Sequence, residues 1–283
     1  MLSDPSGTVG FVRRYVALDL ETVPDEDLVS AMDAEPARPY ADKLGRLLAA
    51  RRAQSGGRSD FLPIPYHRPV VACSLEAVER DGALVVADVG CWTDRRADEG
   101  VFLESTWKRL QGGTLVTFHG RGFDLPVLEL RSLKLGLSAP TWFSGARQGT
   151  PQDHHDVFEL LSSGGAASAP LDLYAKLVGL PGKENVAGKD VSALYAQGAL
   201  DRIAGYCMSD VVQTWLLYLR YRLLEGTLSP GGYALSVAAC REDLPALFAE
   251  RLEPAARTFL AGFLERCGPF LDELPAVPLR SVV

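Results

Sequence analysis

Two carboxylates, Asp19 and Glu21, stand two positions apart in the stretch YVALDLETVPD. The apolar residues around them predict a strand, in which side chains at alternate positions project to the same side. Like charges held this close repel each other, and isolated buried carboxylates would largely protonate. A bound cation removes both penalties, and hard oxygen ligands suit Mg²⁺ or Mn²⁺. From the spacing alone, a strand end at which both carboxylates reach water remains the alternative.

A second group lies in TFHGRGFDLPVLELR, residues 117 to 131, where an apolar strand runs through a glycine-containing loop into a helix. Gly120 and Gly122 let the backbone approach a ligand closely, and Arg121 offers a partner for a phosphate. Asp124 stands at the head of the helix, where capping of the helix N-terminus is its alternative role.

A third group lies in YCMSDVVQTWLLYLR, where Tyr206 and Asp210 are four apart on a predicted helix. They share a face of that helix with Thr214, and a polar face turned to solvent is the alternative. Each motif is weak alone. Together, the three groups supply four carboxylates and one phenol.

The elements around these groups alternate between strand and helix. VVACSLEAVERDGALVVADVGCW predicts two strands joined by a hairpin turn at Asp81 and Gly82, so three consecutive strands open the fold. The later pattern predicts a mixed sheet flanked by helices, an α/β fold. The predicted helices and strands after the hairpin are 98–112 (helix), GTLVTFHG (strand), DLPVLELRSLKLG (helix), DHHDVFELLS (strand or short helix), LDLYAKLVGL and VSALYAQG (helices), 199–225 (helix) and 241–266 (helix).

A basic segment separates the first two strands. It holds a helical pattern, YADKLGRLLAARRA, and then the loop QSGGRSD. This segment is a candidate flap that grips a nucleic-acid backbone, with a solvated helix face as the alternative. Its basic residues are Lys43, Arg46, Arg51, Arg52 and Arg58.

The composition is that of a globular protein of 283 residues, 47% hydrophobic and 23% charged. No window approaches the roughly 18 to 20 apolar residues of a membrane span, and the N-terminus lacks a signal layout, so we expect a cytoplasmic location. Five scattered cysteines without a CxxC pair suggest neither a disulfide framework nor a zinc site. The net charge of -7 argues against a broad electrostatic grip on nucleic acid and leaves room for a local basic patch.

The three groups together resemble the DEDD superfamily of 3′-5′ exonucleases, in the subtype with tyrosine in its last motif. Gly205 stands five positions before Asp210, where the other subtype carries histidine. Within the superfamily, the chain resembles the bacterial predicted 3′-5′ exonucleases related to the proofreading domain of family B DNA polymerases. The stretches that carry this resemblance, between residues 15 and 220, are LDLETVP, FLPIPYHRPVVACS, FHGRGFDLPVLELR, HHDVFELLS, GLPGKENVAGKDVSALYAQG and IAGYCMSDVVQTWLLYLR.

The resemblance implies an RNase H-like mixed sheet flanked by helices, with additional C-terminal helices. We expect residues 1–225 to form the exonuclease domain and residues 226–283 to form a helical extension packed on its core. In this family pattern, four carboxylates hold two divalent ions, Mg²⁺ or Mn²⁺, about 3.5 to 4 Å apart. Tyr206 orients the attacking water. The four metal-binding positions are Asp19, Glu21, Asp124 and Asp210.

Other residues are candidates for contact with nucleic acid. Phe123 would stack on the terminal base, and Lys183 and Lys189 would contact phosphates or merely cap loops. Leu20 and Arg121 complete this set, with packing in the core as the alternative for Leu20 and for Phe123. His154 and His155 point to opposite faces of a strand and therefore do not form a joint metal site with Asp156, which is a candidate for the surroundings of the site.

The resemblance implies hydrolysis of phosphodiester bonds at the 3′ end of single-stranded nucleic acid, with release of nucleoside 5′-monophosphates. We expect DNA rather than RNA as the substrate, although no motif reveals contacts to the 2′ hydroxyl. Two other functions remain open. One is an inactive nucleic-acid-binding scaffold, and the other is a metal-dependent phosphoesterase that acts on small molecules. Protein partners are not indicated by any motif.

Overall fold

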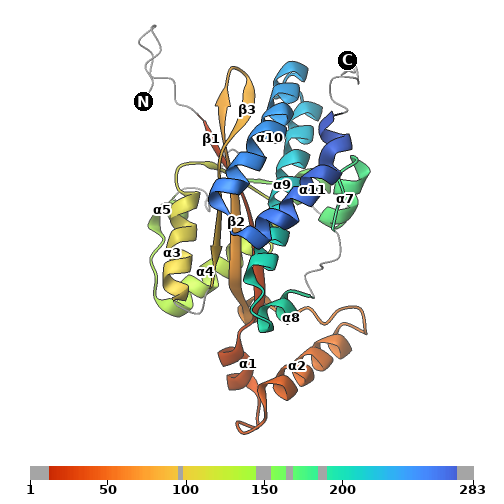
Figure 1. Ribbon diagram of the computed structural model, residues 1–283. Helices are drawn as coiled ribbons and strands as arrows, with labels where there is room; N and C mark the ends of the chain where they lie inside the picture. The colour runs from red at the N-terminus through yellow and green to blue at the C-terminus, as the bar shows by residue number, and fades with distance from the viewer. Residues whose placement is uncertain (1–12, 95–97, 145–153, 164–167, 184–189, 273–283) are drawn as a thin grey trace.

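A five-stranded sheet forms the centre of the molecule (Figure 1). The computed structural model describes residues 13–94, 98–144, 154–163, 168–183 and 190–272. The strand order is β3-β2-β1-β4-β5, with β1, β2 and β3 antiparallel and β4 and β5 parallel to β1. The strands are β1 (Arg14–Pro24), β2 (His67–Arg80), β3 (Ala83–Thr93), β4 (Thr114–Thr117) and β5 (His154–Asp156). This mixed sheet confirms the predicted α/β class.

Helices cover both faces of the sheet (Figure 1). On one face, α9 and α10 pack against β1, β2 and β3, and α11 packs on α9 and α10, while α3, α4 and α5 cover the other face. Among the described residues, no helix combines the length and the hydrophobicity that a membrane crossing requires. The helices are α1 (Glu26–Met32), α2 (Tyr40–Gln54), η1 (Ile64–Tyr66), α3 (Glu99–Leu110), α4 (Asp124–Leu135), α5 (Pro140–Ser144), α6 (Val157–Leu161), α7 (Leu171–Leu177), α8 (Val191–Ala196), α9 (Leu200–Leu224), α10 (Pro230–Arg251) and α11 (Pro254–Asp272).

Side chains of β1 alternate between two apolar clusters. Tyr15 and Ala17 belong to the cluster shared with α9, whereas Val16, Leu18 and Leu20 belong to the cluster shared with α3 and α4. This two-sided burial explains the nearly continuous apolar run in the sequence. The next odd-numbered positions of β1 therefore face α9, and these positions carry the two carboxylates.

The hairpin between β2 and β3 turns at the two predicted residues. Asp81 and Gly82 both have positive φ, 49° and 75°, as a type I′ turn requires. The strands pair from Arg80 with Ala83 onwards. The opening arrangement of three antiparallel strands is thus confirmed.

The C-terminal helices correct one prediction. The expected helix over 241–266 is two helices, because the chain is extended at Leu252 (φ -112°, ψ 156°) and restarts at Pro254. Proline lacks an N–H and disfavours the helical conformation in the residue before it. α10 packs against β3 and α11 packs against α9. The apolar cluster runs without a break across residue 226, and the division of the chain at that point stays a prediction.

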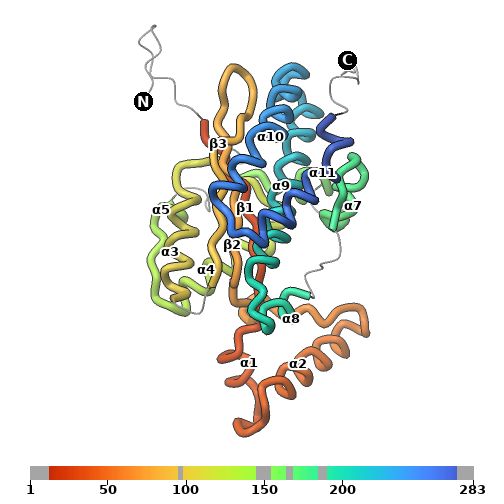
Figure 2. The backbone as a smooth tube through the Cα atoms, viewed as in Figure 1, coloured from red at the N-terminus to blue at the C-terminus, as the bar shows by residue number. Residues whose placement is uncertain are grey.

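The segment between β1 and β2 extends away from the sheet. Figure 2 shows the chain leaving β1, passing through α1 and α2, and returning to the start of β2. Most residues of α2 are exposed, and the helix contacts α1. We call residues 40–61, which comprise α2 and the loop after it, the basic arm.

Candidate active site

Three carboxylates from two elements meet on the α9 side of the sheet. Oxygen atoms of Asp19 and Glu21 on β1 and of Asp210 on α9 all lie within 4.8 Å of one another. Helix α9 packs along β1, and the Cys207 thiol contacts the main-chain oxygen of Asp19 at 3.3 Å. The prediction that the two strand carboxylates share a side is confirmed, and Asp210 completes their group from a residue 189 positions away in the sequence.

Asp124 stands beside this group at the start of α4. Its Oδ1 accepts the main-chain N–H of Leu20 at 3.0 Å, which ties the head of α4 to the middle of β1. The alternative of helix capping is wrong, because the cap position is Phe123 and Asp124 is the first helical residue. The carboxylate is therefore free of a capping role and is held at the residue between the two strand acids.

The loop before Asp124 is folded tightly onto itself. A Cβ at Gly120 would lie 2.5 Å from the Thr117 side chain, and a Cβ at Gly122 would lie 2.6 Å from the His119 ring. Asp156 accepts the main-chain N–H of His119 at 2.7 Å and holds the loop from β5. The glycines thus serve close packing within the loop, which is a different reason from the predicted approach of a ligand.

Arg121 points toward the edge strand β5. Its main-chain N–H donates to Asp156 at 2.9 Å, and its guanidinium donates to the main-chain oxygen of His154 at 2.7 Å. An ion pair with Glu159 at 3.3 Å completes its contacts. These bonds occupy the guanidinium, and a contact between Arg121 and a phosphate stays a prediction.

Burial raises the pKa values of all four carboxylates, and repulsion from the other acids of the group adds to it for Asp19 and Glu21. Burial is the largest cause in each case. The charges of Asp124, Glu21 and Asp210 raise the pKa of Asp19 further. The pKa of Asp124 rises to about 7 although its bond from Leu20 opposes the shift. The site therefore holds more negative charge than its own surroundings neutralise.

Lys183 brings one positive charge into the acidic group. Its Nζ lies 3.0 Å from Asp210 Oδ2 and donates to the Tyr206 hydroxyl at 2.6 Å. The main-chain N–H of Lys183 donates to Asp172 at 2.6 Å, and the preceding Gly182 has φ of 72°. A Cβ at Gly182 would lie 2.4 Å from Asp172, so glycine is needed for this loop to close on α7.

Tyr206 is a buried phenol one helical turn before Asp210. Burial, and then the charges of Asp210 and Glu21, raise the pKa of Tyr206 far above its ordinary value. The hydroxyl therefore stays protonated at neutral pH and can donate a hydrogen bond while it accepts one from Lys183. This side chain can position a water molecule but cannot act as a base.

The donors fit a hard divalent cation. Asp19 Oδ2 is buried and has no hydrogen-bond partner among the described residues, which is costly for a carboxylate oxygen. The group consists of carboxylates alone, the ligand set that Mg²⁺ and Mn²⁺ prefer. Two buried acids, the half-buried Asp19 and one lysine leave a deficit of positive charge that such an ion would fill.

The remaining predicted residues lie in different places. Leu20 is 4% exposed and packs in the core with α3 and α4, so its burial speaks against the expected contact with nucleic acid. Lys189 lies outside the described residues. The side chains of His154 and His155 make separate contacts, with Thr117 and Tyr218 respectively.

Two rings near the site were missed in the sequence. Phe61 and His67 contact Phe123, with ring centroids 5.6 and 5.0 Å from it. Nothing in the spacing could reveal this contact, because more than fifty residues separate His67 from Phe123. Only the return of the chain from α2 to β2 brings the rings together.

A cavity of about 950 Å³ lies elsewhere, at the starts of β1 and β4. Its lining includes Arg14, Trp107, Thr114 and Trp142, and none of the four carboxylates. The acids identify the other end of the strands, because they combine buried charge with an unpartnered oxygen.

The sheet order, the helical layers and the acids on the central strand define an RNase H-like α/β protein with a candidate metal-binding site. Residues 59–267 match the family described as predicted 3′-5′ exonucleases related to the exonuclease domain of PolB, and the chain belongs to this family. The matched range contains Asp124, Tyr206 and Asp210 and begins after Asp19 and Glu21. No curated protein matches the chain.

Proposed function

We propose that this protein is a two-metal-ion 3′-5′ exonuclease. It hydrolyses the terminal phosphodiester bond of single-stranded nucleic acid, DNA in preference to RNA, and releases nucleoside 5′-monophosphates. One observation carries the proposal: the carboxylates of half-buried Asp19 and of buried Glu21 and Asp210 converge within 4.8 Å beside the central strand of an exonuclease-family fold. The polynucleotide substrate follows from the family.

The carboxylates of Asp19, Glu21 and Asp210 would hold the ions, with Asp124 as the ligand from α4. When bound, divalent ions supply Lewis acidity, a lowered pKa for water and charge stabilisation in the transition state. The protein's part is to fix the ligands before substrate arrives. The bond from Leu20 to Asp124 and the packing of α9 on β1 provide that rigidity.

Tyr206 and Lys183 act on the reacting groups without carrying the acid-base chemistry. The protonated Tyr206 hydroxyl orients the attacking water, a positioning task. The Lys183 ammonium balances part of the acidic charge in the absence of substrate, through its contact with Asp210. In the complex it is placed to attract a phosphate oxygen of the terminal nucleotide.

In the domain assignment that accompanies this proposal, residues 1–225 carry the chemistry. Every residue named above for the ligands and for the water lies in that range. Residues 226–283 form the helical extension, whose helix α10 packs on β3 and whose helix α11 packs on α9. Because α9 carries Asp210 and Tyr206, the packing of α11 on α9 supports the helix that holds these two site residues.

The test is a time course with 5′-labelled single-stranded DNA and RNA of equal sequence, in Mg²⁺, Mn²⁺ and EDTA. We expect a metal-dependent ladder that shortens from the 3′ end. Asp210→Asn should reduce the rate at least 10²- to 10³-fold, about the loss seen when one electrostatic stabiliser of a transition state is removed. The matched control is Glu104→Gln, which neutralises an exposed carboxylate on α3 and should leave the rate unchanged.

Full metal-dependent activity in Asp210→Asn would refute the assignment. If wild type binds both polymers and cuts neither in any metal, the protein is a nucleic-acid-binding scaffold. Cleavage of nitrophenyl phosphates without cleavage of polynucleotides would identify a small-molecule phosphoesterase instead.

A further inference from the structure

Phe61 is a large apolar side chain that remains exposed at the end of the basic arm. Its exposed fraction is 55%. One face of its ring stacks on His67, with centroids 4.9 Å apart and planes inclined by 30°. His67 in turn meets Phe123 edge-on, at 5.0 Å and 85°. The three side chains form a continuous set of rings, which we call the ring trio, with Phe61 as its solvent-facing member.

The ring trio ends beside the candidate metal ligands. His67 Nδ1 lies 2.8 Å from the hydroxyl of Thr22, which directly follows Glu21 on β1. Phe123 directly precedes Asp124. Burial lowers the pKa of His67, so its ring is neutral at pH 7 and presents the same flat, uncharged surface as a phenyl ring. A base stacked on this surface would lie next to the acidic group.

The basic arm leads from the ring trio into solvent. It holds five Lys and Arg residues against two Asp, in a chain whose net charge is -7. Arg52 and Arg58 are exposed and have no carboxylate partner among the described residues. Arg51 Nε donates to the main-chain oxygen of Phe61 at 3.3 Å and so joins the last turn of α2 to the main chain of Phe61.

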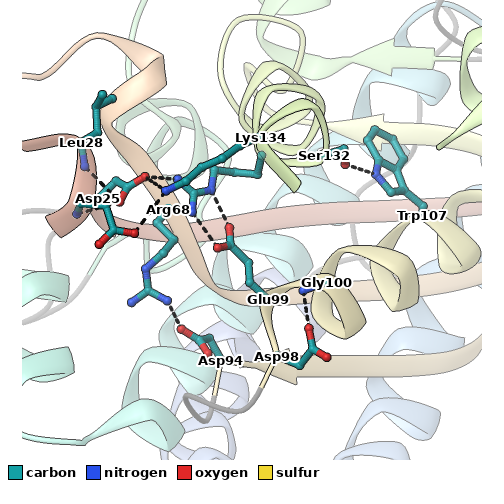
Figure 3. Close-up of polar contacts among 12 residues, drawn as sticks. Asp25, Leu28, Arg68, Asp94, Asp98, Glu99, Gly100, Trp107, Ser132 and Lys134 are labelled. Atoms are coloured by element: carbon teal, nitrogen blue, oxygen red, sulfur yellow. Dashed lines mark hydrogen bonds and ion pairs between the residues drawn. The ribbon is translucent and has the colours of Figure 1, made fainter. Parts of the chain in front are cut away.

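The segment that carries the basic arm is fixed at its start by ion pairs to α4. Asp25, between β1 and α1, pairs with Arg131 and with Lys134, both on α4 (Figure 3). Arg131 also pairs with Glu99 at the start of α3, with Nη2 and Oε2 2.6 Å apart. This network fixes the direction in which the chain leaves β1, so the surface is held before a ligand arrives.

We propose that the basic arm and the ring trio bind the stretch of single-stranded nucleic acid that leads away from the terminal phosphodiester. Bases stack on Phe61, and phosphates meet Arg52 and Arg58. Stacking on aromatic rings is independent of sequence and is accompanied by charge along the backbone, which is the usual way in which single strands are bound. A polyanion also matches this basic segment of an acidic chain. The proposal rests on the proposed function for its ligand.

The experiment measures binding of 5′-fluorescein oligo(dT) of 2 to 12 nucleotides to the full chain in EDTA, by anisotropy at several salt concentrations. Phe61→Ala should weaken binding of the longer oligonucleotides about 5- to 160-fold, the range expected for loss of one stacked base. Arg52→Gln combined with Arg58→Gln should lower the salt slope by about 1.4, because each phosphate contact contributes about 0.7 on a single strand. Both losses should grow with oligonucleotide length.

Two controls separate binding from folding. Phe61→Tyr keeps the ring and should restore wild-type affinity. Arg241→Gln neutralises an exposed arginine on α10 that pairs with Asp272, and it should change neither the affinity nor the salt slope. Circular dichroism of each variant verifies that the fold is retained.

The outcomes distinguish this proposal from the proposed function. If wild type degrades single strands and the Phe61 and arginine variants bind as wild type does, the basic arm is not the binding surface and only the proposed exonuclease activity is supported. If wild type binds with the predicted length dependence but cuts nothing in any metal, binding by the basic arm is supported and the proposed exonuclease activity is refuted. Equal losses in Arg241→Gln and in the arm variants would also overturn the proposal, because any exposed arginine would then suffice.

Discussion

Two groups of buried acids lie along the same strand and its end, and they are opposite in electrostatics. Around Asp19 and Glu21, burial and like charge raise every carboxylate pKa, with Lys183 as the nearby cation. At Asp25, burial also raises the pKa, but hydrogen bonds from Lys134 and Arg131 outweigh it and the net pKa is lowered. The Asp19 group lacks enough positive charge to balance its carboxylates, whereas the carboxylate of Asp25 is paired with two cations.

This difference separates a candidate binding site from a structural joint. In the Asp25 network every charge meets an opposite charge, and the network ties β1, α3 and α4 together (Figure 3). The Asp19 group keeps an unpartnered carboxylate oxygen, and a bound cation would stabilise it. Buried charge therefore indicates function here only where the protein does not supply the counter-charge itself.

The largest expected effect comes from breaking the ion pairs of the Asp25 network. Arg131→Met removes the cation shared by Asp25 and Glu99 and leaves both acids without it. Removing one partner of a buried pair costs about 3–5 kcal/mol of unfolding free energy. Denaturant unfolding measures the loss, and Arg241→Gln, at an exposed pair, should cost less than about 1 kcal/mol. A loss below 1 kcal/mol in Arg131→Met would show that the network is not a structural joint.

The next effect is the pH dependence of the unfolding free energy that arises from the Asp19 group and the adjacent Asp124. The pKa of Asp124 is about 7 in the folded protein against an ordinary 3.8, so folding favours the protonated form. Its contribution to stability is complete below about pH 4 and is lost as the pH rises through 7, at most about 4 kcal/mol. In EDTA, the unfolding free energy of wild type should fall over this window, and Asp124→Asn should flatten the fall. Identical pH profiles would contradict the raised pKa.

A divalent ion should reverse that loss. At a concentration 100 times its Kd, Mn²⁺ should stabilise the folded state by about 2.7 kcal/mol and raise the Tm by about 5–10 °C. Thermal unfolding at pH 8 with and without Mn²⁺ measures the shift. Asp210→Asn should abolish most of it, whereas Glu104→Gln should keep it. An equal shift in both variants would place the ion somewhere else.

The smallest effect tests the comparison most directly. The same change, aspartate to asparagine, should alter the unfolding free energy in opposite directions at Asp19 and at Asp25. In EDTA at pH 8, Asp19→Asn should stabilise the protein by about 1 kcal/mol, since it removes a charge repelled by its neighbours. Asp25→Asn should destabilise it by about 1–3 kcal/mol, since it weakens charged hydrogen bonds. Paired denaturant curves measure both. If both substitutions change the unfolding free energy in the same direction, the two groups do not differ in their electrostatics as described.

Local pattern was enough for most of the elements. The alternation around Asp19, the two-residue turn at Asp81 and Gly82, and the helical spacing that places Tyr206 with Asp210 each depend on neighbouring residues only. The predicted helix over 241–266 was wrong where a weak local signal, the proline at 254, outweighed a regular apolar period. Such a break is visible in the sequence but its strength depends on packing.

The sequence by itself determined the fold class, the family and the order of the acidic motifs, because hydrophobic period, turn residues and motif spacing are properties of short stretches. Only the tertiary structure decided which charges meet. It placed Lys183 against Asp210, Arg131 against Asp25, and Phe61 near Phe123. These pairs join residues far apart in the chain, and their energies depend on burial and on the counter-charges nearby, which no local pattern records.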